Sequence, residues 1–179
     1  MKKIATHNSA TGEEGSGLLS WLVTPFSKCQ SKTLVEQYKA GVRYFDIRVR
    51  QKARGFVCAH GLWESKKLVL TLLGELDRRA TEDCYISLTY EGDTSEDIMT
   101  ALKQAVDSLC PRLKVVYVAK KRPQWTVLEQ YKAVAVEQCY KVLDFSTWHT
   151  LLPLPRLWQK VYYRDVEFNE ETFKMVDFI

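Results

Sequence analysis

The sequence lacks the cysteine patterns and the long apolar runs that define several large classes of protein. Its 179 residues include five cysteines, but no CxxC pair and no Cys/His cluster of the zinc type. No apolar run reaches the length of a signal-peptide core or a membrane helix, so we expect a soluble, cytoplasmic protein unless a longer precursor carries an export signal. Odd in number and widely spaced, the cysteines are predicted to be buried thiols in a reducing compartment: Cys29, Cys58, Cys84, Cys110 and Cys139.

Long basic blocks are also absent. The formal net charge is +4, with Lys and Arg scattered among 22 acidic residues. This balance argues against a nucleic-acid partner and supports at most a transient contact with an anionic membrane surface. Because 46% of the residues are hydrophobic and no internal repeat or linker is present, residues 1–179 are predicted to fold as one domain. We expect a monomer.

Short β-branched or aromatic segments alternate with stretches of helical period, which favours an α/β fold with mainly parallel strands. Three helices are expected, at Leu34–Ala40, Ser65–Arg79 and Ser95–Leu109. The eight strand candidates are Lys3–Thr6, Arg43–Arg48, Phe56–Ala59, Cys84–Tyr90, Lys114–Val118, Ala133–Glu137, Lys160–Tyr163 and Phe173–Phe178.

Eight strands fit a TIM-type (β/α) barrel. Such barrels usually have about 250 residues, so we predict a small or distorted barrel with some crossover helices short or missing. One such place is Val49–Gly55, which is too short for a helix. It predicts a plain turn between two strands that pair as a hairpin.

Polar side chains stand near the carboxyl ends of three strand candidates. His7 follows KKIAT, Asp46 and Arg48 lie within VRYFDIRVR, and His60 follows FVCA. In a barrel these ends converge on one face, where active sites are built. Taken alone, each histidine is more simply interpreted as a structural residue. Arg48 could likewise form an ion pair with Asp46 that only sets the strand register.

The runs ATHNSATG, EQYKAGVRYFDIRVR, AHG and YISLTYEG resemble, in order and spacing, the X-type catalytic domain of phosphatidylinositol-specific phospholipase C. The resemblance covers residues 3–92 and returns at FKMVDFI, which looks like the family's last strand. It implies that His7 is the general base, taking a proton from the inositol 2-hydroxyl, and that His60 is the general acid for the leaving glycerol oxygen. The implied products are a cyclic inositol phosphate and diacylglycerol, from phosphatidylinositol or a related inositol phosphodiester.

The resemblance assigns roles to further residues of the site. Arg48 would bind the phosphate, Asp46 would orient Arg48 or a histidine, and Asp177 would hold the His7 imidazole in the right tautomer. Trp63, three residues past the AHG histidine, is expected at the mouth of the site. Asn8 stands where the bacterial enzymes have an aspartate that helps the general acid, and Glu91 is the candidate substitute for that charge.

Metal dependence separates the two branches of the family. The animal enzymes bind Ca²⁺ through an Asn after the first histidine, a pair of acidic residues on the second strand and a Glu on the fourth. Asn8 is present here, but Arg48 and Thr89 occupy two of the acidic positions. The resemblance is therefore to the bacterial, metal-independent enzymes, and we expect no metal and no cofactor.

Two other functions remain open from the sequence. A metal-dependent glycerophosphodiesterase or sphingomyelinase-D-like enzyme uses a similar barrel with two histidines, although Arg48 argues against its Glu and Asp metal cluster. A non-catalytic module that binds inositol phosphates or lipids would keep the phosphate pocket without turnover, and Asn8 motivates that alternative.

Overall fold

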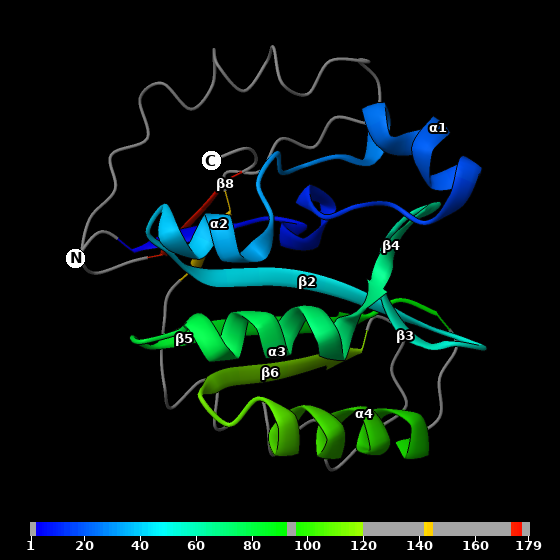
Figure 1. Ribbon diagram of the computed structural model, residues 1–179. Coiled ribbons are helices and arrows are strands. Elements are labelled where there is room, and N and C mark those ends of the chain that lie inside the picture. The colour runs from blue at the N-terminus through cyan, green and yellow to red at the C-terminus, as the bar shows by residue number, and fades with distance from the viewer. Residues whose placement is uncertain (1–2, 93–95, 120–141, 145–172, 177–179) are drawn as a thin grey trace.

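The computed structural model describes residues 3–92, 96–119, 142–144 and 173–176, and within them eight strands form one mixed sheet (Figure 1). The strands are β1 (Ile4–Thr6), β2 (Val42–Lys52), β3 (Gly55–His60), β4 (Trp63–Leu68), β5 (Cys84–Tyr90), β6 (Leu113–Ala119), β7 (Val142–Asp144) and β8 (Phe173–Val176). Six of them pair in parallel in the order β6-β5-β2-β1-β8-β7, while β3 and β4 are added to the end of β2 as antiparallel neighbours.

Strand β2 organises the sheet, because β1 and β5 both pair with it and its last residues pair with β3. Its side chains alternate between two faces. Phe45, Ile47 and Val49 are fully buried in the main hydrophobic core. Asp46 and Arg48 therefore belong to the opposite face, which is the face that carries the polar residues of interest.

Four helices and a 3-10 turn accompany the described strands: α1 (Gly17–Ser27), α2 (Leu34–Lys39), α3 (Val69–Arg79), α4 (Glu96–Leu109) and η1 (Ser9–Gly12). Figure 1 shows α3 lying across the sheet, with α2 and α4 on either side of it. Leu72, Leu73 and Leu76 of α3 are almost completely buried against the sheet. Helix α2 begins with a capping box between Thr33 and Glu36, which explains why its start is readable from sequence.

The predicted hairpin is confirmed, but the predicted helix that follows it starts too early. β2 and β3 pair in antiparallel fashion around a short turn, as the segment Val49–Gly55 indicates. Residues from Ser65 to Leu68 belong to β4, and the helix begins only at Val69. The Ser65 hydroxyl, fully buried, accepts a hydrogen bond from the Cys58 amide and donates one to the Lys67 carbonyl. The bond from Cys58, which joins β3 to β4, and the bond to Lys67 within β4 outweigh the local helical pattern.

Most of the predicted strands fall within the described residues. The candidates that became β1, β2, β3, β5, β6 and β8 are confirmed in type, whereas α1, β4 and β7 were not predicted. Ala133–Glu137 and Lys160–Tyr163 lie outside the described residues. The fold is mixed α/β with an open sheet in the described part, where no pairing joins β6 to β7, and the closed barrel stays a prediction.

The cysteine prediction is correct for three residues and wrong for one. Cys58, Cys84 and Cys110 are buried free thiols, and burial raises the pKa of each, to about 12, about 12 and about 11. Cys29 is only partly buried, because it lies in the loop after α1, beside the polar residues described below. Cys139 lies outside the described residues. No helix in the described ranges is both long and apolar enough to cross a membrane.

Candidate functional site

The parallel pairing of β1 with β2 brings His7 next to two charged side chains. Thr6, the last residue of β1, is aligned with Phe45 of β2, so His7 emerges beside Asp46 and Arg48. His7 Nε2 lies 3.1 Å from Arg48 Nη2 and 3.9 Å from Asp46 Oδ2. A guanidinium can only donate, so Nε2 carries a lone pair and the proton of a neutral His7 is on Nδ1.

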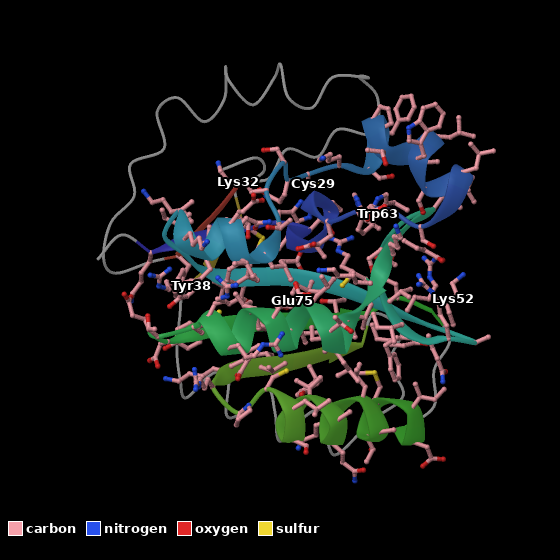
Figure 2. The ribbon with its side chains drawn as sticks, in the orientation of Figure 1. Cys29, Lys32, Tyr38, Lys52, Trp63 and Glu75 are labelled. Atoms are coloured by element: carbon pink, nitrogen blue, oxygen red, sulfur yellow. The ribbon has the colours of Figure 1, made fainter. Side chains whose placement is uncertain are left out.

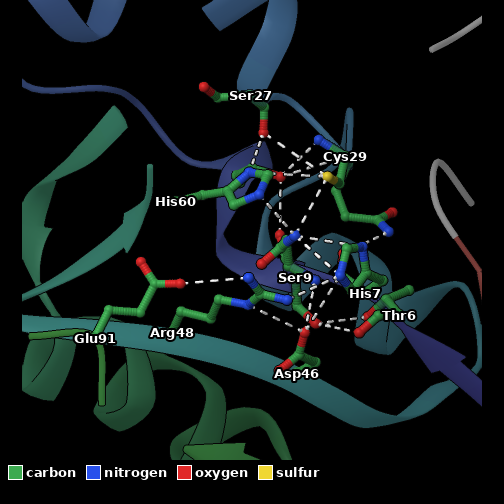
Figure 3. A network of polar contacts seen from close by, with 12 residues as sticks. Thr6, His7, Ser9, Ser27, Cys29, Asp46, Arg48, His60 and Glu91 are labelled. Atoms are coloured by element: carbon green, nitrogen blue, oxygen red, sulfur yellow. Dashed lines mark hydrogen bonds and ion pairs between the residues drawn. The ribbon is translucent and has the colours of Figure 1, made fainter. Parts of the chain in front are cut away.

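Arg48 is held between two carboxylates. Its Nε lies 3.8 Å from Asp46 Oδ2, and its Nη1 lies 3.3 Å from Glu91 Oε1 (Figure 3). The side chains of Asp46 and Glu91 are 12% and 9% exposed, whereas that of Arg48 is 24% exposed. The second oxygen of Glu91 lies 3.6 Å from Nη2 of Arg50. The guanidinium of Arg48 is thus fixed in orientation and still accessible to an anion.

His60 ends β3 and is oriented by the last residue of α1. Its Nδ1 lies 2.8 Å from the Ser27 carbonyl oxygen. Because a carbonyl can only accept, Nδ1 carries a hydrogen and Nε2 is the nitrogen that gains or loses the second proton. Burial lowers the pKa of His60, the bond to Ser27 opposes that effect, and the positive charge of Arg48 adds to it.

The two imidazoles face each other across the site. Their ring centroids lie 6.4 Å apart and their planes are inclined by 79°. One group placed between them can lie within hydrogen-bonding distance of a nitrogen on each ring, since each such bond spans about 3 Å. Figure 3 shows Arg48 on the floor of the same arrangement, extending from β2 toward His7.

Asn8 connects the two histidines. Its Nδ2 lies 3.1 Å from His7 Nε2, 3.2 Å from His60 Nε2 and 3.5 Å from Cys29 Sγ. Its backbone is left-handed, with φ of 43°, the only positive φ of a non-glycine residue in the described chain. The Asn8 backbone amide donates to Asp46 Oδ2 over 3.2 Å. These contacts place Asn8 inside the site, and the residue is only 2% exposed.

Most of the predicted site residues come together, but Trp63 does not lie where it was expected. His7, His60, Arg48, Asp46, Asn8 and Glu91 form one connected network of polar contacts. Trp63, the first residue of β4, is 2% exposed and packs in the hydrophobic core, so its expected position at the mouth is wrong (Figure 2). Its side chain fills space beside Gly15, where an added Cβ would lie 2.8 Å from Nε1.

Two other predictions concern Glu91 and Asp177. Glu91 pairs with Arg48 and Arg50, and it is the weakest of the influences on the pKa of His60. Its role as the substitute for a missing aspartate stays a prediction. Asp177 lies outside the described residues, although Val176, which precedes it, pairs with Thr6.

Sequence reasoning missed Ser27 and Cys29. Both belong to the end of α1 and the loop after it, and Cys29 Sγ lies 4.0 Å from His60 Nδ1. No local pattern marks these residues as neighbours of His60. Their position follows from the loop, in which the Cys29 and Gln30 amides donate to the Thr11 hydroxyl.

The donor set of the site is mainly cationic and neutral. Two histidines, an arginine and an amide surround two carboxylates that are already paired with Arg48. Within the described ranges, no group of three or more His, Cys, Asp or Glu side chains has the arrangement of a metal site. The chemistry these residues can perform is proton transfer by two imidazoles beside a fixed positive charge.

Comparison with known proteins gives a match of fold. No family model and no curated protein matches the sequence. Among solved structures, the chain is similar to the phosphatidylinositol-specific phospholipase C from Listeria monocytogenes, with a TM-score of 0.69 and 13% sequence identity. The match covers 99% of this chain and 88% of that one. At this identity the likeness shows a shared fold.

Proposed function

We propose that this protein is a phosphodiesterase of the phosphatidylinositol-specific phospholipase C type, acting as a phosphorus–oxygen lyase. The observation that carries the proposal is the convergence of His7, His60 and Arg48 from three different strands of a fold shared with such an enzyme. Two imidazoles on opposite sides of a cationic site are the groups that an intramolecular phosphoryl transfer requires. Likeness of fold alone would not distinguish this function from others.

In the proposed reaction His7 Nε2 removes the proton of the inositol 2-hydroxyl, and that oxygen attacks the phosphorus atom. The bond from phosphorus to the glycerol oxygen breaks, and this oxygen receives the proton of His60 Nε2. The products are a cyclic inositol phosphate and diacylglycerol. His7 ends protonated and His60 ends neutral, so hydrolysis of the cyclic phosphate would use the same two groups in reversed roles.

Arg48 has two tasks in this scheme. Without substrate its Nη2 donates to His7 Nε2, the atom proposed to act as the base. A bound phosphate would accept that donor instead, which frees the Nε2 lone pair for the 2-hydroxyl. Asp46 and Glu91 keep the guanidinium in place while negative charge builds on the phosphate oxygens.

The surface next to His60 supports a lipid as the substrate. Helix α1 contains no charged residue, and Figure 2 shows many of its side chains projecting away from the body of the protein. Because Ser27 of α1 bonds to His60, this surface adjoins the site. Lys28 follows the helix and suits an anionic headgroup. The apolar face of α1 consists of five side chains that are each more than half exposed: Leu18, Leu19, Trp21, Leu22 and Phe26.

The experiment that tests the proposal is an assay of purified protein with vesicles containing phosphatidylinositol, in excess EDTA. We expect release of cyclic inositol phosphate and diacylglycerol at the same rate with and without the chelator. Absence of turnover in both conditions would refute the proposed phosphodiesterase activity. Turnover that needs Ca²⁺ would refute the metal-independent form and leave the reaction type intact.

The second candidate is a binding module without turnover. The lowered pKa of His60 favours it, because a general acid must be protonated to work and, among the described residues, no carboxylate is hydrogen-bonded to this ring. Such a module would bind inositol phosphates in a manner that depends on Arg48 and would release no product. Equilibrium binding measured beside the vesicle assay separates the two functions.

A further inference from the structure

Asn8 is a buried amide with only one half of its hydrogen-bonding capacity used. Nδ2 contacts His7, His60 and Cys29, whereas Oδ1 has no partner among the described residues. A buried carbonyl oxygen without a partner destabilises the folded protein, because it has lost its hydrogen bonds to water and gained none in exchange. A protein can retain a buried atom without a partner in one state when that atom makes a hydrogen bond in another state.

The contact between Asn8 and His60 depends on where the His60 proton is. Nδ1 of His60 keeps its hydrogen because it donates to the Ser27 carbonyl. In the neutral ring Nε2 is an acceptor, and the amide Nδ2 at 3.2 Å donates to it. In the protonated ring Nε2 carries a hydrogen, and the same amide orientation would set one N–H against another.

We infer that the side-chain amide of Asn8 turns over with the protonation of His60, presenting Nδ2 to the neutral ring and Oδ1 to the protonated ring. Asn8 is then a positioning residue for the proton that His60 carries. The turn replaces a contact between two donors at His60 by a hydrogen bond and gives the buried oxygen a partner, and in exchange it gives up the bond from Nδ2 to His7 Nε2. This inference rests on the proposed function only in identifying that proton as the one given to the leaving oxygen.

The role differs from that of a fixed charge. An aspartate would favour the protonated ring at all times, whereas a turning amide accepts either form. The leaving oxygen becomes a stronger acceptor as its bond to phosphorus breaks, and it can then replace Oδ1 as the acceptor and take the proton from His60 Nε2. The left-handed backbone of Asn8, held by Asp46, keeps the amide in reach of His60 throughout.

Gln37 provides a matched amide that cannot turn. It is fully buried and its Oε1 also lacks a partner in the described part of the chain. Its Nε2 donates to the carbonyl oxygens of Ser9 and Lys32, over 2.8 and 2.6 Å. Carbonyl oxygens have no second protonation state, so the Gln37 amide is fixed in one orientation.

Other groups also surround His60. Burial lowers its pKa, the bond from Nδ1 to the Ser27 carbonyl raises it, Arg48 and His7 lower it, and Glu91 raises it. The Cys29 thiol lies 4.0 Å from Nδ1. None of these groups contacts His60 Nε2 in the structure, where Asn8 is the neighbour within hydrogen-bonding distance among the described residues.

The direct test is neutron diffraction on deuterium-exchanged crystals of the protein at two pH values, one on each side of the His60 midpoint measured by NMR. At the higher pH we expect deuterium on Asn8 Nδ2 directed at a bare His60 Nε2. At the lower pH we expect deuterium on Nε2 directed at Oδ1. An amide that keeps one orientation at both values would overturn the inference, and so would a His60 ring that leaves Ser27 instead. The Gln37 amide must not change.

A second measurement uses the NMR titration of His60 in variants. Asn8→Asp should raise the His60 midpoint by about one unit or more, because a carboxylate at this position faces Nε2 directly. Gln37→Glu is the matched control, and it should leave the midpoint close to that of the unmodified protein. An unchanged midpoint in Asn8→Asp would show that position 8 does not contact the ring and would overturn the inference.

Neither measurement requires turnover. A protein that fails to cleave phosphatidylinositol but turns its Asn8 amide would refute the proposed function and keep this inference. A protein that cleaves the lipid while its Asn8 amide keeps one orientation would support the proposed function and refute this inference.

Discussion

The two histidines of the site are held by different kinds of interaction. His7 lies among charges, with Arg48 at 3.1 Å and Asp46 at 3.9 Å. His60 lies among neutral groups, namely the Ser27 carbonyl and the Asn8 amide. The site therefore concentrates its fixed charge on the side of the proposed base, whereas hydrogen bonding and burial surround the proposed acid.

The strongest test of this comparison removes each histidine. His7→Ala and His60→Ala should each lower kcat on phosphatidylinositol by about 10²–10⁴-fold, since each removes one proton-transfer step. The measurement is the release of cyclic inositol phosphate, with circular dichroism showing that the variants are folded. Retention of more than a tenth of the activity in either variant would remove that histidine from the mechanism.

Arg48→Lys tests the charged side by itself. Lysine keeps the charge but loses the planar fork that contacts His7 and two carboxylates, so we expect a loss of about 10²–10³-fold in kcat. Arg43→Lys is the matched control, because Arg43 is at the other end of β2 and bonds to Glu82 and the Tyr38 carbonyl. Equal effects of the two variants would mean that Arg48 only supports the strand.

Trp21→Ala tests whether the exposed apolar face of α1, which adjoins His60, contacts the lipid. Removing the larger of the two aromatic side chains from the exposed face of α1 should reduce activity on vesicles by about tenfold through a higher apparent KM. Activity on a soluble inositol phosphodiester serves as the control and should not change, because Trp21 projects to solvent. A similar loss on both substrates would place the effect inside the site.

The smallest effect concerns pH. A general acid must be protonated, and the pKa of His60 is lowered from its ordinary value of 6.5 by burial. The kcat/KM profile, which reports the free enzyme, should therefore fall with rising pH through a pKa below 6.5. A kcat/KM profile that stays flat to pH 8 would show that His60 is not the acid.

Much of the site could be predicted from the sequence because the strands carrying it have strong local signals. His7 and Arg48 lie on segments whose β-branched and aromatic residues predict strands, and the parallel pairing of β1 with β2 follows from the predicted fold class. The resemblance supplied the roles. The structure supplied the contacts, such as the one from Arg48 Nη2 to His7 Nε2.

The failures have physical causes. Helix α1 was missed because its apolar residues face solvent and Pro25 lies within it, so the usual core-facing pattern is absent. β4 looked like the start of a helix because its stability comes from pairing with β3 and from the buried Ser65 hydroxyl. Trp63 was placed at the mouth from its distance in sequence to His60, but alternation along β4 turns it into the core.

The orientation of the Asn8 side-chain amide could not be predicted from the sequence. The resemblance showed only that an amide stands in place of a carboxylate. Which of its atoms faces His60 depends on the Ser27 carbonyl, which approaches from a helix that was not predicted. Long-range contacts of this kind leave no pattern in a single sequence.

The pairing of the strands also sets an order in which the site can assemble. His60 is carried by the hairpin of β3 and β4, whose partners are close in sequence, and the hairpin is joined to the chain at Gly15 by a bridge to Ser65. His7 follows β1, which must find β8 near the other end of the described chain. Local pairings close quickly and distant ones slowly, because loop-closure entropy grows with separation. During refolding the surroundings of His60 should form first, and catalytic competence should return only when the first and last strands meet.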